Sequence, residues 1–339
     1  MVCKGCGKEN ASRAIEYCYE CIIEGKVKEV QSRIEKRMEY GLVAYPPEDG
    51  SSPCSFCGNS CRPFQGGYGW CGERFYDGKK WTGGDESAHL VWYYDPIPTN
   101  CVAAWFCPAT KKERGKYNLA VFYESCSFDC LFCQNWHWRE GRRRSPVWYK
   151  NLAEKVVDEV ACICFFGGDP SSNIKHTILV AEEALKRKKV RICWETNGHI
   201  KKEFLLKMAE LAEETEGIIK FDIKAYSDEL YRVLCGVSGK LVYKNFEILA
   251  ERLSHLNPPR LCASTLLVPY YVNEREVKKI AGFIAKLNPS IPYSLLAFYP
   301  AYLMDDLPCT SKEEAYRAFQ SAREAGLKNI NIGNIHLLI

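Results

Sequence analysis

From residue 116 onward, apolar segments of strand length alternate with longer amphipathic segments, and this alternation restricts the fold more than any other feature. Strands that alternate with helices of about 10–15 residues form parallel sheets with right-handed crossovers. Six such units are fewer than the eight of a closed (β/α)8 barrel. We therefore predict an α/β fold with a partial (β/α)6 TIM-like barrel over residues 116–339. We expect the first crossover helix at 151–160 and strands at 118–124, 161–166, 190–195, 217–224, 261–268, 291–298 and 329–332.

The ends of these strands carry the residues best suited to chemistry. In barrels of parallel strands, the active site lies at the carboxyl ends of the strands. The groups that fall at such ends are the segment 126–133, Gly167-Gly168-Asp169, Glu195-Thr196-Asn197, Asp222 to Lys224, and Tyr299.

The segment after the first strand contains three closely spaced cysteines, Cys126, Cys130 and Cys133, in the sequence Cys-Ser-Phe-Asp-Cys-Leu-Phe-Cys. Thiolates are soft ligands that suit zinc, copper(I) or iron–sulfur clusters. A [4Fe–4S] cube has four irons, so three cysteines leave one iron open to a substrate or cofactor. Chance proximity in a cysteine-rich chain is the competing interpretation, and the position directly after a strand favours a metal centre.

The strand at 217–224 has charged residues on one of its faces. Side chains alternate between the two faces of a strand, so Lys220, Asp222 and Lys224 share a face. Barrel strands are normally apolar on both faces, and buried charge is unfavourable unless it is paired or binds a ligand. We predict ligand contact for Lys224, which lies nearest the carboxyl end. An internal Lys–Asp ion pair that only fixes geometry is the alternative.

Two small cysteine-rich modules precede the predicted barrel. The first module, residues 1–45, contains Cys3, Cys6, Cys18 and Cys21 in two Cys-x2-Cys pairs. Four thiolates fit a tetrahedral structural zinc site, and a segment this small depends on its metal for folding. An electron-transfer cluster is the alternative.

The second module, residues 46–115, contains Cys54, Cys57, Cys61 and Cys71 among several glycines. Its spacing predicts a bound metal without separating zinc from an auxiliary iron–sulfur cluster, and we place zinc somewhat ahead. The other eight cysteines lie mostly in apolar contexts typical of core residues. They are Cys101, Cys107, Cys162, Cys164, Cys193, Cys235, Cys262 and Cys309.

Between the two sets of module cysteines, residues 26–40 are expected to form a helix. Val27, Val30, Ile34 and Met38 are spaced by three and four and predict one apolar stripe. We expect the Lys, Glu and Arg residues of this helix to form a solvated face.

The composition fits a folded protein in a reducing compartment. Of the 339 residues 47% are hydrophobic, and a net charge of +4 does not require a nucleic-acid partner. Nineteen cysteines, an odd number, argue against a disulfide framework. No uncharged apolar run approaches the ~18 residues of a membrane helix, and no apolar signal region follows Met1. We therefore expect a cytoplasmic protein that does not contact a membrane.

Several ordered motifs resemble the radical SAM superfamily, in particular its pyruvate formate-lyase-activating type. They are the triplet at 126–133, Gly-Gly-Asp-Pro at 167–170, Glu-Thr-Asn-Gly at 195–198 and Phe-Asp-Ile-Lys at 221–224. A closer resemblance, over about residues 50–339, is to the radical SAM member of the AmmeMemoRadiSam group. It also includes Cys54-x2-Cys57-x3-Cys61 with Cys71-Gly-Glu-Arg, Asp95-Pro-Ile, Cys133-Gln-Asn-Trp136, Phe298-Tyr-Pro-Ala-Tyr302 and Gly326-Leu-Lys with Ile-Gly333-Asn334.

This resemblance implies that Cys126, Cys130 and Cys133 hold a [4Fe–4S] cluster whose open iron binds S-adenosylmethionine. Reductive cleavage would then give a 5′-deoxyadenosyl radical that abstracts hydrogen from a substrate. The cofactor-binding residues that the resemblance implies are Phe132 and Gln134 near the adenine, Gly167 and Gly168 at the methionyl ammonium, Glu195 at the ribose, and Lys224 with Asp222 at the methionyl carboxylate, together with Asp169 and Asn197. The chain departs from the family pattern in two places, with Asp169 in place of the usual glutamate and Tyr299 in place of a histidine.

Three functions stay open at this point. The first is an enzyme that acts on a protein, as glycyl-radical activases do, with a ferredoxin or flavodoxin as electron donor. The second is an RNA-modifying enzyme, since Arg139, Arg142, Arg143 and Arg144 lie beside tryptophans and suit phosphates and stacked bases. The third is an iron–sulfur electron carrier or scaffold, which would not need the polar residues at the strand ends.

Overall fold

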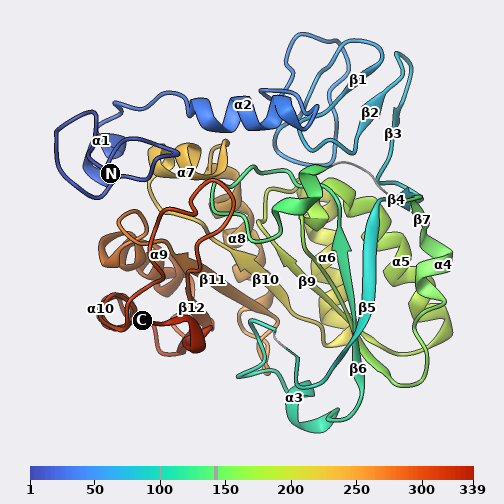
Figure 1. Ribbon diagram of the computed structural model, residues 1–339. Helices are drawn as coiled ribbons and strands as arrows, with labels where there is room; N and C mark the ends of the chain where they lie inside the picture. Colours follow the sequence, from blue (N-terminus) through green and yellow to red (C-terminus); the bar gives the residue numbers. More distant parts are fainter. Residues whose placement is uncertain (100, 141–143) are drawn as a thin grey trace.

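The computed structural model describes residues 1–99, 101–140 and 144–339. Its centre is an eight-stranded sheet with the strand order β13-β12-β11-β10-β9-β8-β6-β5. The sheet has different strands at its two edges and is therefore an open, partial barrel, so the predicted fold is confirmed (Figure 1). The parallel strands are β6 (Tyr117–Tyr123), β8 (Val160–Phe166), β9 (Arg191–Thr196), β10 (Ile219–Asp222), β11 (Leu261–Leu267), β12 (Tyr293–Ala297) and β13 (Ile330–Gly333).

One edge strand has the opposite direction. β5 (Leu90–Pro96) pairs with β6 in antiparallel register, with Leu90 opposite Tyr123. The sequence predicts an extended segment here but not its place in the sheet. The domain boundaries at residues 45 and 115 stay a prediction.

The helices between the parallel strands pack on the sheet with their apolar faces. In α9, for example, Val277, Ile280 and Ile284 are fully buried. Side chains cap this helix and α10: Asn273 accepts from two backbone N–H groups of α9, and Ser311 and Glu314 form a capping box. The helices are α4 (Tyr149–Ala153), α5 (Ile174–Arg187), α6 (Lys202–Thr215), α7 (Asp228–Cys235), α8 (Lys240–Leu253), α9 (Glu274–Leu287) and α10 (Lys312–Glu324).

Shorter elements complete the described part of the chain. They are α1 (Tyr19–Ile23), α2 (Gln31–Glu39), α3 (Ala109–Lys112), β1 (Gly67–Tyr68), β2 (Phe75–Tyr76), β3 (Trp81–Thr82), β4 (Ser87–Ala88), β7 (Val147–Trp148) and the 3₁₀ turns η1 (Trp136–Glu140), η2 (Pro170–Asn173) and η3 (Ile335–Leu337).

The helix predicted at 151–160 is wrong in its bounds. Helix α4 ends at Ala153, and Val160 already belongs to β8, where it is fully buried and pairs with Tyr117. A short apolar run does not by itself distinguish a helix from a strand, and here pairing with β6 decides the outcome.

The helix predicted at 26–40 is shorter and is oriented differently from the prediction. Helix α2 spans Gln31–Glu39, and its predicted apolar residue Met38 is 64% exposed. Arg33 and Arg37 are buried instead, with 6% and 0% exposure. The prediction of a solvated charged face is therefore wrong at these two positions, because both guanidinium groups find partners inside the protein.

The first module docks on the late part of the chain (Figure 1). The Ser12 backbone N–H donates to the Tyr271 hydroxyl at 2.7 Å, and the Ser12 hydroxyl donates to Asp306 at 2.8 Å. The Tyr19 hydroxyl donates to Glu276 at 2.9 Å. These contacts, several of them buried, attach the amino-terminal end of the chain to α9 and the segment after β12.

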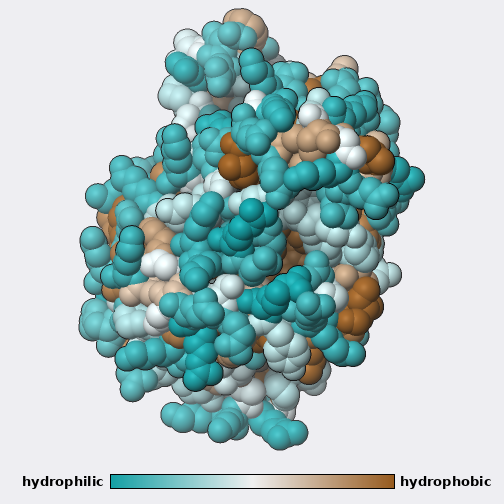
Figure 2. All heavy atoms as spheres, turned by 90° about the vertical axis from the view of Figure 1, so that its left-hand side faces the viewer, coloured by the Kyte–Doolittle hydropathy of each residue, from teal (hydrophilic) through white to brown (hydrophobic). Residues whose placement is uncertain are grey.

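The outer surface on this side is mainly polar. Figure 2 shows a largely hydrophilic face in which hydrophobic residues are scattered in small groups. Across the described residues, no helix has both the length and the apolar composition that crossing a bilayer requires.

Candidate active site

A cavity of about 520 Å³ opens at the carboxyl ends of the parallel strands. The structure brings every residue predicted for the cluster and the cofactor to the wall of this cavity. They are Cys126, Cys130, Phe132, Cys133, Gln134, Gly167, Gly168, Asp169, Glu195, Asn197, Asp222 and Lys224. Tyr299 is 54% exposed and is not part of the cavity wall.

The loop with the three cysteines rests on the end of α7. The backbone N–H groups of Asp129 and Leu131 donate to the carbonyl oxygens of Cys235 and Leu234, both at 2.9 Å. Cys126 and Cys130 are buried and Cys133 is half-buried. The loop is thus held by backbone hydrogen bonds while all three cysteines contribute to the cavity wall.

The two glycines after β8 allow the end of this strand to pack closely against the cysteine loop. Gly167 and Gly168 have positive φ angles of 67° and 47°, which favour glycine. A Cβ atom at Gly168 would lie 2.2 Å from the carbonyl oxygen of Tyr123 and 2.4 Å from that of Ser125. Because Ser125 directly precedes Cys126, the glycine allows the close approach that positions the cysteine loop.

We therefore expect Gly168→Ala to impair activity and to lower stability by more than about 1 kcal/mol, because backbone atoms would have to move and φ would be strained. The measurement is 5′-deoxyadenosine formation together with urea unfolding. Gly282→Ala is the matched control, since nothing lies within 4 Å of its Cβ position inside α9. The control should be stabilised by about 0.5–1 kcal/mol. Equal behaviour of the two variants would contradict the structural role of Gly168.

Asp169 organises the neighbouring strand end. Its carboxylate accepts from the Asn197 backbone N–H at 2.6 Å, the Ser171 N–H at 2.8 Å and the Thr196 hydroxyl at 3.1 Å. Burial raises the pKa of this carboxyl group, and these hydrogen bonds oppose the shift. The shorter side chain in place of glutamate is thus fully used by donors of the protein, and direct contact with a cofactor stays a prediction.

Lys224 and Asp222 form an ion pair at the cavity wall. Burial alone would lower the pKa of Lys224, but Asp222 and the nearby thiols raise it, so the ammonium stays charged. The second carboxylate oxygen of Asp222, Oδ1, is buried and has no hydrogen-bond partner within the protein. The Lys–Asp pair that was the alternative to ligand contact is therefore present, and Asp222 Oδ1 has no partner among the described residues. Ligand contact for Lys224 stays a prediction.

Lys220 lies on β10 two residues before Asp222, beside several thiols. It is 1% exposed and donates to the Cys164 sulfur at 3.2 Å. Its charge opposes the increase in the pKa of Glu195 that burial causes. Of the cysteines predicted as core, Cys164 is buried as expected, but it and the half-buried Cys101 also reach the cavity wall.

Cys235, predicted only as a core residue, lies next to the cysteine loop. Its sulfur is 3.6 Å from that of Cys130, and the hydrogen bond between them lowers the pKa of the Cys130 thiol. Two sulfurs on one tetrahedral ion are about 3.8 Å apart for metal–sulfur bonds of about 2.3 Å, and ligands of different irons in a cube are farther apart. Cys235 is fully buried and is not part of the cavity wall. It fits a hydrogen-bond partner of Cys130 better than a fourth cluster ligand.

Asp129, inside the cysteine loop, is the centre of a buried charge network that the sequence did not indicate. Arg37 donates to its carboxylate at 3.0 Å and Arg139 at 2.6 Å. Arg33 donates to the Asp129 carbonyl oxygen at 3.0 Å. Helix α2 of the amino-terminal region thus contacts the loop that carries Cys130.

This network tests whether an iron–sulfur cluster fits the site. The guanidinium groups of Arg37 and Arg139 contact the Asp129 carboxylate, and the buried guanidinium of Arg33 binds backbone carbonyl oxygens beside it. One carboxylate thus faces three cations, which leaves an excess of positive charge beside the cysteine loop. The Nη1 atom of Arg139 is buried without a partner. A [4Fe–4S] cluster with three thiolates is negatively charged and would balance this excess, so the residues present fit the group.

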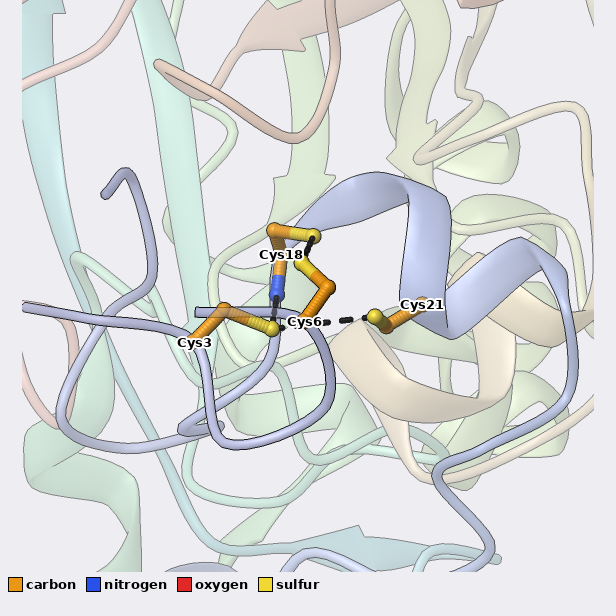
Figure 3. Close-up of side chains that lie close together, drawn as sticks. All are labelled: Cys3, Cys6, Cys18 and Cys21. Atoms are coloured by element: carbon orange, nitrogen blue, oxygen red, sulfur yellow. Dashed lines mark hydrogen bonds between the residues drawn. The ribbon is translucent and has the colours of Figure 1, made fainter. Parts of the chain in front are cut away.

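In the first module, four sulfurs converge (Figure 3). The sulfurs of Cys3 and Cys21 are 3.7 Å apart and those of Cys6 and Cys18 are 3.6 Å apart. A zinc ion with four bonds of about 2.3 Å requires sulfur–sulfur separations of about 3.8 Å. The module therefore fits a single tetrahedral ion.

The arginine run after the cysteine loop is only partly described, and its two described members are both engaged with carboxylates. Arg139 is 1% exposed and binds Asp129, and Arg144 pairs with Glu124 at 2.9 Å. Arg142 and Arg143 lie outside the described residues. The interpretation of Arg139 as a nucleic-acid contact is therefore wrong, because its guanidinium is already bound inside the protein.

An open barrel with three closely spaced cysteines at its strand ends fits the radical SAM class. The model of the radical SAM superfamily matches residues 120–284, so this part of the chain is a radical SAM domain. The AmmeMemoRadiSam grouping stays a prediction.

Individual relatives are distant. The pyruvate formate-lyase 1-activating enzyme of Escherichia coli is 27% identical over 138 residues, which are 39% of this chain and 55% of the relative. An uncharacterized protein of Methanocaldococcus jannaschii is 26% identical over 222 residues, 62% of this chain and 61% of the relative. The chain thus aligns with only about half to three-fifths of the length of these relatives.

One solved structure supports the fold. Streptococcus suis SuiB bound to S-adenosylmethionine is 15% identical and has a TM-score of 0.50, covering 68% of this chain and 54% of that chain. At this identity the likeness concerns the fold alone.

Proposed function

We propose that this protein is a radical SAM enzyme that abstracts hydrogen from a protein substrate. The observation that carries the proposal is the single cavity that gathers the three cysteines, the Gly167–Gly168 turn and the Lys224–Asp222 pair. A simple electron carrier would not need this pocket.

In this proposal, Cys126, Cys130 and Cys133 hold the [4Fe–4S] cluster. When bound, the cluster and S-adenosylmethionine supply a one-electron reduction that breaks a sulfonium C–S bond and yields a 5′-deoxyadenosyl radical. Lys224 neutralises the carboxylate of the methionyl group, and the unpartnered Oδ1 of Asp222 accepts a hydrogen bond from the ligand.

The remaining wall residues orient the rest of the ligand. Glu195 accepts from the ribose hydroxyls, because a carboxylate offers only acceptors when it is ionised. Phe132 and Gln134 flank the adenine. Trp105 also lines the cavity and is 40% exposed, so in this proposal it contacts the incoming substrate. The buried wall limits access of water to the reacting atoms.

A protein substrate is proposed because the E. coli relative is an activating enzyme of pyruvate formate-lyase, which is itself a protein. The electron donor in this proposal is a ferredoxin or flavodoxin. Of the arginine run, Arg139 is buried and Arg144 is paired with Glu124, so these two residues give an RNA substrate no specific support.

Anaerobic reconstitution tests the proposal directly. With iron, sulfide, dithionite and S-adenosylmethionine, we expect methionine and 5′-deoxyadenosine, and we expect the electron paramagnetic resonance signal of the reduced cluster to change when S-adenosylmethionine binds. A reconstituted cluster that neither responds to S-adenosylmethionine nor produces 5′-deoxyadenosine would overturn the proposal.

We further propose that the first module holds structural zinc. Cys18→Ala should reduce the zinc content by about one ion per chain and make residues 1–45 sensitive to protease, because such modules depend on metal for folding. Metal analysis and limited proteolysis measure both effects. The control Cys309→Ala removes a half-buried thiol outside the module and should change neither. Unchanged zinc in Cys18→Ala would contradict the assignment.

A further inference from the structure

The second module gathers four sulfurs in an arrangement that differs from that of the first. Cys54, Cys57, Cys61 and Cys71 are all buried, with exposures of 4–7%. The Cys54 backbone N–H donates to the Cys61 carbonyl oxygen at 2.9 Å, and the N–H of Trp70, which precedes Cys71, donates to the Cys61 sulfur at 3.3 Å. These contacts bring the cysteines of the module together. Within residues 1–99, 101–140 and 144–339, however, only the first module brings three or more ligand atoms within 4.8 Å of one another.

The distance between ligand sulfurs differs between a single metal ion and an iron–sulfur cluster. One zinc ion would draw all four sulfurs to about 3.8 Å from one another, as in the first module. In an iron–sulfur cluster the thiolates bind different irons, so they are spread more widely. We propose that Cys54, Cys57, Cys61 and Cys71 hold a second iron–sulfur cluster. Four cysteines are the usual ligand set of [2Fe–2S] and [4Fe–4S] clusters.

The surroundings of the four sulfurs suit a redox cluster. The backbone N–H of Trp70 donates to the Cys61 sulfur at 3.3 Å. Phe56 and the Trp70 side chain are nearly fully buried beside them. Hydrogen bonds to sulfur and exclusion of solvent are the features that set the reduction potentials of such clusters.

With four protein thiolates the second cluster has no open iron, so it can transfer electrons but cannot bind a substrate. Its position fits that role. Gly58 packs so closely on His199 that a Cβ would lie 2.3 Å from the ring nitrogen. The His199 ring is 5.3 Å from that of Phe128, whose backbone N–H donates to the Cys126 sulfur at 3.4 Å. Continuous contacts thus lead from Cys57 to Cys126.

A direct hydrogen bond also joins the two regions, from the Asn59 side chain to the Ser127 carbonyl oxygen at 2.7 Å. We infer that the second cluster takes one electron from a reduced ferredoxin- or flavodoxin-type donor and passes it to the cluster at Cys126, returning to its oxidised form. This electron-transfer role rests on the proposed function, whereas the metal site itself does not.

Iron analysis of two anaerobically prepared proteins tests the site. The triple variant Cys126→Ala, Cys130→Ala, Cys133→Ala should retain about two or four irons with equivalent sulfide, according to the cluster type, and give a resonance signal after reduction with dithionite. Adding Cys54→Ser and Cys61→Ser should remove this iron and leave one zinc. The wild-type protein should contain about four irons more than the triple variant, and its Mössbauer spectrum provides a count that does not depend on any variant folding.

Two results would overturn the proposal. One is a triple variant with two zinc ions and no iron; the other is a wild-type protein with only about four irons. If the wild-type protein contains four irons and still forms 5′-deoxyadenosine, the second cluster is refuted while the proposed function stands. If Cys54→Ser with Cys61→Ser keeps activity with dithionite but loses it with a reduced flavodoxin, the electron-transfer role is supported. Equal activity with both donors would refute that role.

Discussion

Replacing Cys130 by alanine is expected to abolish 5′-deoxyadenosine formation while the barrel stays folded. Cys130 lies in a loop rather than in a strand, and its backbone neighbours Asp129 and Leu131 keep their hydrogen bonds to the end of α7. Removal of its sulfur takes away one of only three predicted cluster ligands. Iron content, 5′-deoxyadenosine yield and circular dichroism measured on the same sample check the result.

Cys262→Ala is the matched control for this variant. Cys262 is a thiol with 1% exposure that is not part of the cavity wall, so its loss should leave iron content and product unchanged. The variant Cys235→Ala tests the open corner of the cluster separately. If this variant retains its iron, Cys235 is a hydrogen-bond partner of Cys130 and not a cluster ligand. If the variant loses the cluster, a fourth thiolate closes the site, and this result would contradict the proposal.

The second large effect is expected from Asp129→Asn. This change keeps the shape of the side chain but removes the negative charge that faces Arg37 and Arg139. Breaking a buried ion pair by removing one partner typically lowers stability by about 3–5 kcal/mol. We expect a loss of this order in urea unfolding under anaerobic conditions, together with poorer retention of iron, because the same loop carries Cys130.

Glu313→Gln is the control for the charge change. Glu313 pairs with Arg317 on the surface with 81% of its side chain exposed, and such pairs contribute little to stability. An Asp129→Asn protein with the urea midpoint and iron content of the wild type would show that the buried network does not support the cysteine loop.

The contents of the cavity could be predicted because the relevant residues follow strands directly. Cys126, Gly168 and Lys224 are far apart in the sequence, yet parallel strands bring their carboxyl ends to one edge. Period-two alternation predicted Asp222 and Lys224 on one face; β10 ends at Asp222, and the two side chains pair at the cavity wall. Strand topology therefore explains why these strand ends meet, whereas the choice of Phe132, Gln134 and the other cofactor contacts came from the family resemblance and stays a prediction.

The buried residues that hold the cysteine loop in place could not be predicted in the same way. Arg33 and Arg37 were predicted to face solvent, because a pattern of apolar residues treats every arginine as polar. Such a pattern contains no information about Asp129, the partner of Arg37, which lies 92 residues further along the chain. Cys235 is separated from Cys130 by 105 residues and has no neighbouring cysteine motif. Contacts of this kind depend on tertiary packing, and the antiparallel pairing of β5 with β6 depends on it as well.

The docking of the first module on Tyr271, Glu276 and Asp306 has a consequence for biogenesis. The amino-terminal residues leave the ribosome first, and their four cysteines can take up a metal once Cys21 has emerged. Their docking partners are synthesised some 250 residues later, as the separations of 257 to 294 positions indicate. We therefore expect the module to take up its metal and fold before it can attach, since attachment requires the chain as far as Asp306.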